Sequence, residues 1–543
     1  MRALALVLCS TTLVACSAAQ AAARQALRSA PGQVVPGEAV FLVSGRGWGH
    51  GVGMSQYGAD GMANEGASYA KILAYFYTGT TLGKTSTDEV RVLLAEGRRA
   101  VTVSSSLPFS AVDATGETTK LPAGALVMKP GFVLPATPGR KAHRAVGPVV
   151  FTAGKAPLAL DGRLYRGSLE VGAQKSFLRV VNTVQIESYL QGVVAGEMPH
   201  TWPLEALKAQ AVAARSYALA SLVKGKPFDL YSDQRSQVYL GISGEKARTS
   251  EAVRDTSREV VLYDGKVART LYFSSSGGKT ASAEDVFGIP IPYLVSRPDP
   301  WDTASPYHRW GPIVLGARTV QSKLELPARI VDAVGVPTPS GRVRTVTLQT
   351  TTGATSVPAA LLRSSLGLRS TWISIGVLRL DRPRDAVVYG SSLRLTGVVR
   401  ALPSPMVASS SDGSSWSTVE PFERASDGTV SALVKPGKTT RYRIEVKGGA
   451  SPTLLVQVSP RVRLATPAEL GTLTGTVKPR VTGAPVSIER LKGTTWTQIA
   501  HSTVGATGGF RARVQLVPAS YRARVAATEG LVEGLSPVLT VSG

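Results

Sequence analysis

One carboxylate of this sequence stands where an enzyme could place a proton donor. Residues 192–203 read GVVAGEMPHTWP, and Glu197 is the only carboxylate among them. Its valine, methionine and tryptophan neighbours would shield it from water and raise its pKa, as a general acid requires. The N-terminus of the helix predicted to follow would favour the charged form, and capping that helix is the alternative role. The residues alone leave both roles open. Glu187, upstream, is expected to be a solvated or ion-paired surface residue.

Other motifs that could carry chemistry fail on spacing. The segment SGGKT ends like a phosphate-binding loop, but the required first glycine falls on Phe273. GRGWGH places His50 where the dinucleotide fingerprint needs its third glycine. The serines at 274–276 with His50 could suggest a Ser–His hydrolase, but no G-x-S-x-G elbow surrounds them, and a Ser/Gly-rich turn is favoured. With five histidines and no H-E-x-x-H, a zinc hydrolase has no evident ligand set.

Periodicity predicts the elements that position Glu197. Apolar residues at i, i+3, i+4 and i+7 predict a helix over 69–76. Residues 89–190 alternate apolar and polar side chains between Gly/Pro turns, which predicts strands. Pro203 suits a first helical position, and an Ala/Leu stripe runs from there to Leu222 before KGKP stops it. With mixed, mostly β character over 228–375, the fold class is α+β: mostly β, with one prominent helix behind the Glu197 loop.

The C-terminal part of the chain is a tandem repeat. GSSW ending at Trp416 is answered by GTTW ending at Trp496, and Tyr442-Arg443 is answered by Tyr521-Arg522. A period near 80 with one buried-looking tryptophan per copy predicts two β-sandwich (Ig-like) modules, at 376–460 and 461–543. Neither contains a catalytic cluster, so spacer or wall-binding roles are favoured.

The N-terminus and the charge predict the compartment. Residues 1–23 have a charged start, a short apolar stretch and small residues, which predicts an export signal followed by a linker over 24–40. Cys16 fits a lipobox, which would give a membrane lipid anchor; ordinary cleavage in the run 18–23 is the open alternative. The only two cysteines lie in this leader. A net charge of +24 favours anionic partners. Export makes nucleic acid an unsuitable partner and an anionic cell wall a suitable one.

Several longer blocks resemble one family. They are EMPHTWP around Glu197, EALKAQAVAARSY with Lys208 and Arg215, FSSSGGKT with Ser276 and Thr280, SGRV at 340–343, and GWGHGVGMSQYG with His50 and Gln56. These blocks resemble the sporulation stage II protein D / amidase-enhancer (SpoIID/LytB) family, over about 41–375.

The resemblance implies an exported lytic transglycosylase, which cleaves peptidoglycan glycan strands stripped of stem peptides. It makes Glu197 the catalytic acid and places Lys208 and Arg215 at functional basic positions. These two cations are two helical turns apart on one face, where they could bind the lactyl carboxylate of muramic acid; solvated helix cations are the alternative. His50, Gln56, Ser276 and Thr280 are further candidate substrate contacts.

Two features depart from the family pattern. Some members bind zinc through cysteines just before a Q-V-Y-x-G block; here QVYLG is present, but Ser232 and Ser236 stand nearby, so we expect no metal and no cofactor. The GWGHGVGMSQ block normally closes the family domain and here opens it. A circular permutation would explain this, and it predicts that Phe41–Val43 lie beside Ile373–Ile375. The block's glycines would then let backbone approach the glycan, the alternative being a structural turn in which His50 only packs.

The predicted chemistry needs one carboxyl group. It would protonate the glycosidic oxygen and then accept the proton of the muramic C6 hydroxyl, giving a 1,6-anhydro end without a second carboxylate, unlike paired-carboxylate glycosidases. The competing function is a non-catalytic envelope protein that enhances an N-acetylmuramoyl-L-alanine amidase, which would then be its protein partner.

Overall fold

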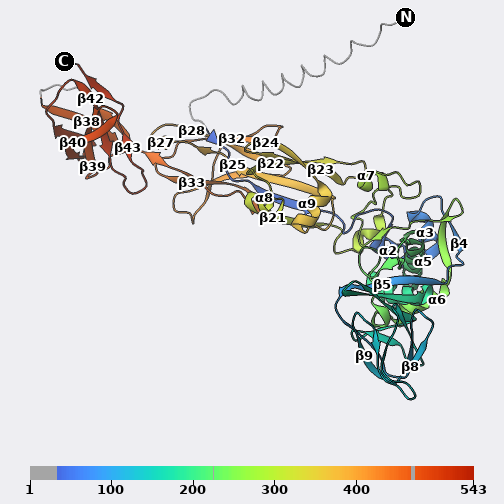
Figure 1. Ribbon diagram of the computed structural model, residues 1–543. Helices are drawn as coiled ribbons and strands as arrows, with labels where there is room; N and C mark the ends of the chain where they lie inside the picture. The colour runs from blue at the N-terminus through green and yellow to red at the C-terminus, as the bar shows by residue number, and fades with distance from the viewer. Residues whose placement is uncertain (1–33, 224, 466–470, 543) are drawn as a thin grey trace, which may run out of the picture.

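The computed structural model describes residues 34–223, 225–465 and 471–542. The molecule is elongated, with the C-terminal module at one end and a strand-rich body, formed by residues 89–185 together with β17 (Leu230–Tyr231), at the other (Figure 1). The mostly β composition predicted from the sequence is confirmed. The predicted export signal, with Cys16, and the linker up to residue 33 lie outside the described residues. Within those residues, no helix is both long and apolar enough to cross a membrane.

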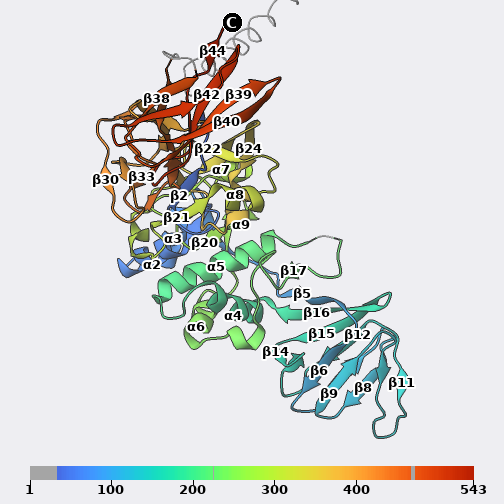
Figure 2. The ribbon, with the colours of Figure 1, turned by 90° about the vertical axis from the view of Figure 1, so that its left-hand side faces the viewer.

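A cluster of helices occupies the middle of the molecule. Figure 2 shows α5 crossing it, with α2 and α3 on one side and α4 and α6 on the other. Their bounds are α2 Gln56–Asn64, α3 Tyr69–Phe76, α4 Ile186–Glu197, α5 Leu204–Ala220 and α6 Ala247–Asp255. The helix predicted at 69–76 is confirmed, and the long helix is confirmed to within two residues at each end. The alanines of α5 are buried on nearly every side, and their small side chains let the other helices approach closely.

The predicted run of strands over 89–190 ends earlier than expected. Residues 186–190, which include Glu187, begin α4 instead. Ile186, Tyr189, Leu190 and Val193 follow helical spacing and are all buried, so this apolar stripe favours a helix over a strand.

The strand-rich body contains a seven-stranded sheet, β17-β5-β16-β15-β12-β7-β8, and a four-stranded sheet, β14-β13-β6-β9. Their bounds are β5 Glu89–Arg98, β6 Val101–Ser105, β7 Phe109–Val112, β8 Thr118–Leu121, β9 Gly124–Met128, β12 Val149–Thr152, β13 Leu158–Leu160, β14 Arg163–Tyr165, β15 Ser168–Gln174, β16 Phe177–Gln185 and β17 Leu230–Tyr231. Its core includes Val193 and Val194 of α4 and Ala214 of α5. The end of α4 that carries Glu197 is therefore anchored on a large core.

A six-stranded sheet joins distant parts of the chain in the order β21-β2-β25-β28-β32-β31. Its bounds are β2 Val40–Gly45, β21 Trp310–Gly316, β25 Ile373–Leu380, β28 Leu393–Arg400, β31 Phe422–Arg424 and β32 Thr429–Val434. Val43 pairs with Ile375 and Gly45 with Ile373, so the contact predicted between Phe41–Val43 and Ile373–Ile375 is confirmed. The domain boundary expected between 375 and 376 falls inside β25.

One face of this sheet is covered by a second, smaller sheet and two helices. Buried residues of β2 and β25 share a core with Val346 and Leu362. The covering elements are α8 Ala317–Lys323, β22 Ile330–Pro337, β23 Val343–Thr350, β24 Gly353–Pro358 and α9 Ala359–Leu366. The connection back to the helices runs through β3 Met54–Ser55, which pairs in parallel with β20 Tyr272–Phe273.

Each C-terminal repeat folds as two packed sheets. In the first repeat, β28, β31 and β32 pack against a sheet that contains β29 Met406–Ser410 and β33 Thr440–Val446. In the second, β37 Arg461–Leu464, β38 Thr472–Lys478 and β41 Gly509–Arg513 pack against β39 Pro485–Lys492, β40 Thr495–Thr503 and β42 Ala519–Val525. The Ig-like classification stays a prediction.

The tryptophans of the repeats are not in the cores, contrary to expectation. Trp416 and Trp496 lie half-buried at the surface, where Arg443 and Arg522 cover their rings at 3.8 and 4.3 Å from the ring centroids. Each core instead contains the tyrosine of its repeat, Tyr442 or Tyr521, and the second core also contains Phe510.

Candidate functional site

Glu197 is the last residue of α4, and Met198 is its C-cap. The predicted alternative, that Glu197 caps the following helix, is wrong: α5 begins only at Leu204, and no side chain caps it. Burial raises the pKa of Glu197 above its ordinary value. Its place at a helix C-terminus acts in the same direction, because the partial negative charge there disfavours an anion. The raised pKa expected from the sequence is therefore supported. The helix contributes in the opposite direction to the one expected, because Glu197 lies at the C-terminus of α4 and not at the N-terminus of α5.

Fixed hydrogen-bond donors hold the Glu197 carboxyl group. The Val238 backbone N–H points at Oε1 from 3.4 Å, and the Tyr272 hydroxyl also donates to the carboxylate. Gln237 donates to the Tyr272 hydroxyl at 2.8 Å and accepts from the Tyr189 hydroxyl at 3.1 Å. Because the Tyr272 hydroxyl accepts from Gln237, its own proton is available for the hydrogen bond that lowers the pKa of Glu197.

Tyr272 and Gln237 are site residues that sequence reasoning missed. Gln237 belongs to the QVYLG block, and this block is the sequence signal that could have identified it. Tyr272 directly precedes the FSSSGGKT block but carries no motif of its own. Its pKa is raised well above the ordinary value by burial, and Glu197 adds to that shift.

Gln56 brings the displaced glycine-rich block to the candidate acid. Its side-chain amide donates to the Glu197 backbone carbonyl at 2.9 Å and to Gln210 of α5 at 3.4 Å. The side chain is only 7% exposed, so Gln56 is a positioning residue rather than the substrate contact that the sequence suggested. The block and Glu197 are therefore neighbours, as the permutation hypothesis requires.

The glycines of this block approach protein rather than open space. Gly47 and Gly51 have φ of 70° and 89°, and a Cβ at either position would collide with Ser275 or with the Arg342 guanidinium. His50 packs beside Phe273, and its Nδ1 accepts from the Val52 N–H at 3.1 Å. Burial, with the Arg363 and Arg342 charges, lowers its pKa to about 4, so it is neutral at neutral pH. These contacts support the alternative of a structural turn in which His50 packs.

The FSSSGGKT block is also structural. Ser276 is fully buried and donates its backbone N–H to Asp302 at 2.8 Å, and buried Thr280 accepts from the Arg297 N–H at 2.8 Å. Neither hydroxyl can contact a ligand from these positions. Ser275 and His308 both bind the Asp302 carboxylate, each at 3.0 Å, rather than each other. This arrangement lacks the nucleophile–base contact of a Ser–His hydrolase.

The two basic residues expected to bind substrate are engaged in ion pairs. Arg215 is 0% exposed; it binds both oxygens of Glu187, at 3.1 and 2.6 Å, and the backbone carbonyls of Glu259 and Val253. Lys208 bridges Glu205 at 3.3 Å and Asp255 at 3.0 Å. The substrate-contact prediction is thus corrected: their shared helix face is occupied by carboxylates from this chain. The prediction of an ion-paired Glu187 is confirmed.

The region where some relatives would hold zinc does not suit the metal. The Ser236 hydroxyl accepts from the Tyr231 N–H at 3.1 Å, and a neutral hydroxyl is a poor substitute for a thiolate ligand. Across residues 34–223, 225–465 and 471–542, no group of three His, Cys, Asp or Glu side chains is arranged to hold a metal ion.

Four aromatic side chains form a row that starts at the loop after Glu197. The Tyr57 ring lies 4.9 Å from Trp202 and 6.4 Å from Tyr307, and Tyr307 lies 4.4 Å from Trp48. Trp48 is 42% exposed, and the other three are partly exposed. Flat apolar faces with polar edges suit sugar rings, which have apolar faces and polar rims. We call these four residues the aromatic row.

Comparison with known families identifies the segment around Glu197. Residues 174–263 match the SpoIID family, described as Stage II sporulation protein. This segment is therefore similar to SpoIID domains. It contains Glu197, α5 and Gln237, whereas Gln56 and Tyr272 come from outside it. The resemblance inferred from the sequence is confirmed, and the site is assembled from three separate parts of the chain.

Proteins that are similar to this chain include two of Bacillus subtilis. Its Stage II sporulation protein D is 33% identical over 210 residues, which are 35% of this chain and 60% of that protein. Its Amidase enhancer is 37% identical over 147 residues, 27% of this chain and 20% of that protein. An uncharacterized protein of Brachyspira hyodysenteriae is 44% identical over 138 residues, 25% of this chain and 38% of that protein. The chain thus spans less than two thirds of each relative.

Likeness to solved structures is slight. A tandem Ig structure from titin covers 28% of this chain and 90% of its own, at 12% identity and a TM-score of 0.14. That value is too low to inform the fold.

Proposed function

We propose that this protein is an exported cell-wall enzyme, a lytic transglycosylase that cleaves peptidoglycan glycan strands stripped of stem peptides. The observation that carries the proposal is Glu197, a partly buried carboxyl group with a raised pKa and fixed donors from Tyr272 and Val238. The aromatic row, which starts in the loop after Glu197, suits a glycan. The SpoIID domain and the relative named Amidase enhancer support a role at the cell wall.

The proposed reaction uses Glu197 as acid and then as base. Its carboxyl proton passes to the glycosidic oxygen between muramic acid and glucosamine as the C1–O bond breaks. The C6 hydroxyl oxygen of the same muramic acid then bonds to C1, and its proton returns to the carboxylate. The products are a 1,6-anhydro-muramic end and a new glucosamine end, and no water is consumed.

The surrounding residues suit both halves of this cycle. Burial raises the pKa of Glu197 and so favours the protonated form that the first step needs, while the Tyr272 and Val238 donors stabilise the carboxylate that the first step leaves behind. Gln56 fixes the backbone of Glu197 through its carbonyl, so the carboxyl group keeps its position as the charge changes.

A second function is favoured by the relative named Amidase enhancer. In that case the protein would bind the glycan and assist an N-acetylmuramoyl-L-alanine amidase without cutting strands itself. Under either function, we propose that the lipobox is processed and that Cys16 then carries a lipid anchor. We also propose that the C-terminal repeats act as spacers or wall-binding modules.

The test replaces Glu197 with glutamine. Glu197→Gln keeps the shape of the side chain and removes the titrating proton, so we expect release of anhydro-muramic products from stripped glycan to fall by at least about a thousandfold. Glu251→Gln, on the exposed face of α6, is the matched control and should cleave like the wild type. Equal cleavage by the Glu197→Gln protein, with its fold verified by circular dichroism, would remove the enzyme proposal and leave the enhancer.

A further inference from the structure

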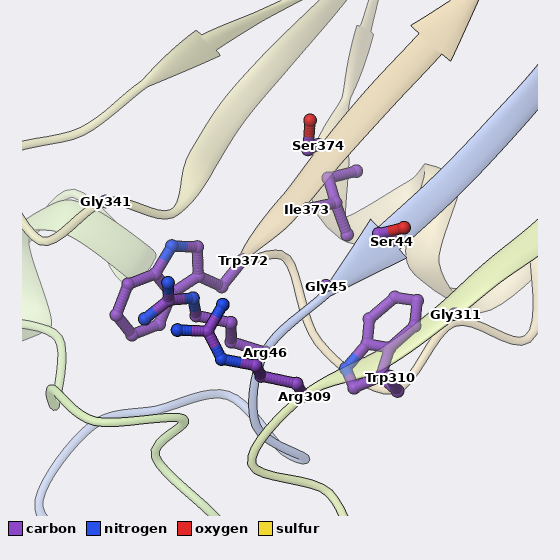
Figure 3. A pocket seen from close by; sticks show the side chains of 10 residues that line it. All are labelled: Ser44, Gly45, Arg46, Arg309, Trp310, Gly311, Gly341, Trp372, Ile373 and Ser374. Carbon is purple, nitrogen blue, oxygen red and sulfur yellow. The ribbon is translucent and has the colours of Figure 1, made fainter. Parts of the chain in front are cut away.

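Two arginines share an open pocket where β2 ends. The pocket has a volume of about 480 Å³ and lies between the ends of β2, β21 and β25. Figure 3 shows the Arg46 and Arg309 side chains next to each other, with Trp372 on one side and Trp310 on the other. The Arg46 guanidinium lies 5.3 Å from the Trp372 ring centroid, which holds it against a flat surface.

The two positive charges are not compensated within the described part of the chain. No carboxylate oxygen there lies within 4.0 Å of either guanidinium, whereas Arg379 and Arg400 of the same six-stranded sheet are ion-paired with Asp381 and Asp332. Burial, and then the charge of Arg309, lower the pKa of Arg46. Like charges held together repel, so an anion bound between them would relieve a cost that the free protein bears.

The loop that carries Arg46 is held rigidly. The Arg46 N–H donates to the Trp372 carbonyl at 2.9 Å, and its carbonyl accepts from the Ser370 hydroxyl at 2.6 Å. Gly47 is fixed in the same way, since its N–H donates to the Tyr307 carbonyl at 2.8 Å and its carbonyl accepts from the Trp310 indole at 2.9 Å. A ligand would therefore meet arginines whose backbone needs no reordering.

The pocket lies at the far end of the aromatic row. Trp48 follows Arg46 by two residues, and Tyr307 precedes Arg309 by two. The row leads from these residues through Tyr57 to Trp202, in the loop that follows Glu197. A glycan lying along the row would thus run from the loop after Glu197 towards the pocket.

We propose that Arg46 and Arg309 form an anion subsite for a carboxylate attached to a sugar ring, namely the free lactyl carboxylate of a stripped muramic acid. Paired guanidinium groups bind a carboxylate through parallel N–H donors, and the partly exposed Trp372 would pack against the ring that carries it. The subsite rests on the proposed glycan function and takes the role that the sequence suggested for Lys208 and Arg215. It also gives a reason for a preference for stripped strands, because a stem peptide converts this carboxylate into a neutral amide.

The experiment measures binding in the Glu197→Gln background, so that no strand is cut. The probes are stripped glycan oligomers, the same oligomers with the lactyl carboxylate reduced to an alcohol, and peptide-bearing oligomers. We expect the stripped oligomers to bind about tenfold more tightly than either of the others, as one charge-assisted bidentate contact allows. The double variant Arg46→Gln/Arg309→Gln should bind all three about equally.

The controls separate charge from folding. Arg318→Gln, whose side chain is 83% exposed on α8, should keep the tenfold preference. Arg309→Gln alone, at an exposed position, should lose most of the preference even if the double variant folds poorly. A double variant that folds and keeps the preference would overturn the subsite, and so would peptide-bearing strands that bind as tightly as stripped ones, since their carboxylates lie on the peptide.

Failure of the subsite and failure of the proposed function give different results. An arginine-dependent carboxylate preference in a protein whose wild type cuts no glycan would retain the subsite and remove the enzyme. Cleavage that depends on Glu197, in a protein with no arginine-dependent preference for the carboxylate, would retain the enzyme and remove the subsite.

Discussion

The protonation of Glu197 links its surroundings to the proposed rate. A general acid works only while protonated, so activity should be lost as pH rises through its pKa. Burial raises that pKa, and we therefore expect the basic limb of the pH–rate profile above the ordinary glutamate value of about 4.5. The Tyr272 hydroxyl opposes this shift by stabilising the charged form.

Tyr272→Phe removes the hydrogen bond that lowers the pKa of Glu197 and leaves the burial that raises it. Removing the donor should raise the pKa of Glu197 further, so the basic limb should move to higher pH by about half a unit or more, while the maximal rate falls because the carboxylate loses support. Cleavage rates measured across pH on stripped glycan provide the check. Tyr389→Phe, in the first C-terminal repeat, should leave the limb in place. A limb that moves down in Tyr272→Phe would contradict the assigned hydrogen bond.

Asp299 is a second buried acid, and its effect is on stability. Burial, with the Asp302 charge nearby, raises its pKa to about 6. The folded protein then holds a proton that the unfolded chain releases near pH 4, so this contribution to stability is complete below that pH and is lost as pH rises through about 6. The free energy of unfolding of the wild type should fall between about pH 4 and about pH 8 because of this proton. In Asp299→Asn, which cannot titrate, that fall should be smaller by roughly 2–3 kcal/mol.

Urea denaturation at the two pH values checks this expectation. The exposed turn variant Asp264→Asn should lose as much stability as the wild type. If Asp299→Asn also behaves like the wild type, the raised pKa of Asp299 is wrong.

At the scale of elements, α5 shows what the sequence could predict and what it could not. Pro203 and the alanine stripe predicted the helix and its ends. The spacing of Lys208 and Arg215 correctly placed both on one face, but spacing within a helix cannot show what covers that face. The partners Glu187 and Asp255 are remote in sequence, so the cations were assigned to substrate. Tyr272 was missed for the same reason, since only the tertiary fold brings it to Glu197.

Arg215→Ala separates the two roles. Removing the buried guanidinium leaves Glu187 without its partner and two backbone carbonyls without a donor, so unfolding free energy should fall by about 3–5 kcal/mol. Denaturant unfolding measures this, and Arg254→Ala, at an exposed position in the last turn of α6, should cost less than about 1 kcal/mol. An Arg215→Ala protein of unchanged stability with weaker glycan binding would restore the substrate role.

At the scale of the molecule, the six-stranded sheet decides where the chain can be divided. The change in sequence style near 376 suggested a boundary there, yet Val377 and Leu378 of β25 contribute to two different cores. The order of the motifs predicted the pairing of β2 with β25. In the family the GWGHGVGMSQ block follows the segment that corresponds to β25, so the permuted block should still pack beside that segment. The continuation of that sheet into the first repeat had no such signal.

Truncation tests this arrangement. A chain ending at residue 460 keeps both cores that use β25 and removes only the last module, whose core is separate. We expect it to unfold cooperatively near the wild-type temperature and to cleave soluble glycan normally. A chain ending at 375 should be unstable, because β25 loses most of its length. A stable, active protein ending at 375 would contradict the role of the shared sheet.

The most direct test of the central claim is the fate of water during cleavage. Stripped glycan is digested with the wild type in water labelled with heavy oxygen, and the new muramic ends are examined by mass spectrometry. The proposed mechanism predicts 1,6-anhydro ends without label, and none from the Glu197→Gln protein. Labelled reducing ends would show hydrolysis rather than internal attack by the C6 hydroxyl, and unlabelled anhydro ends from Glu197→Gln would show that Glu197 is not the acid.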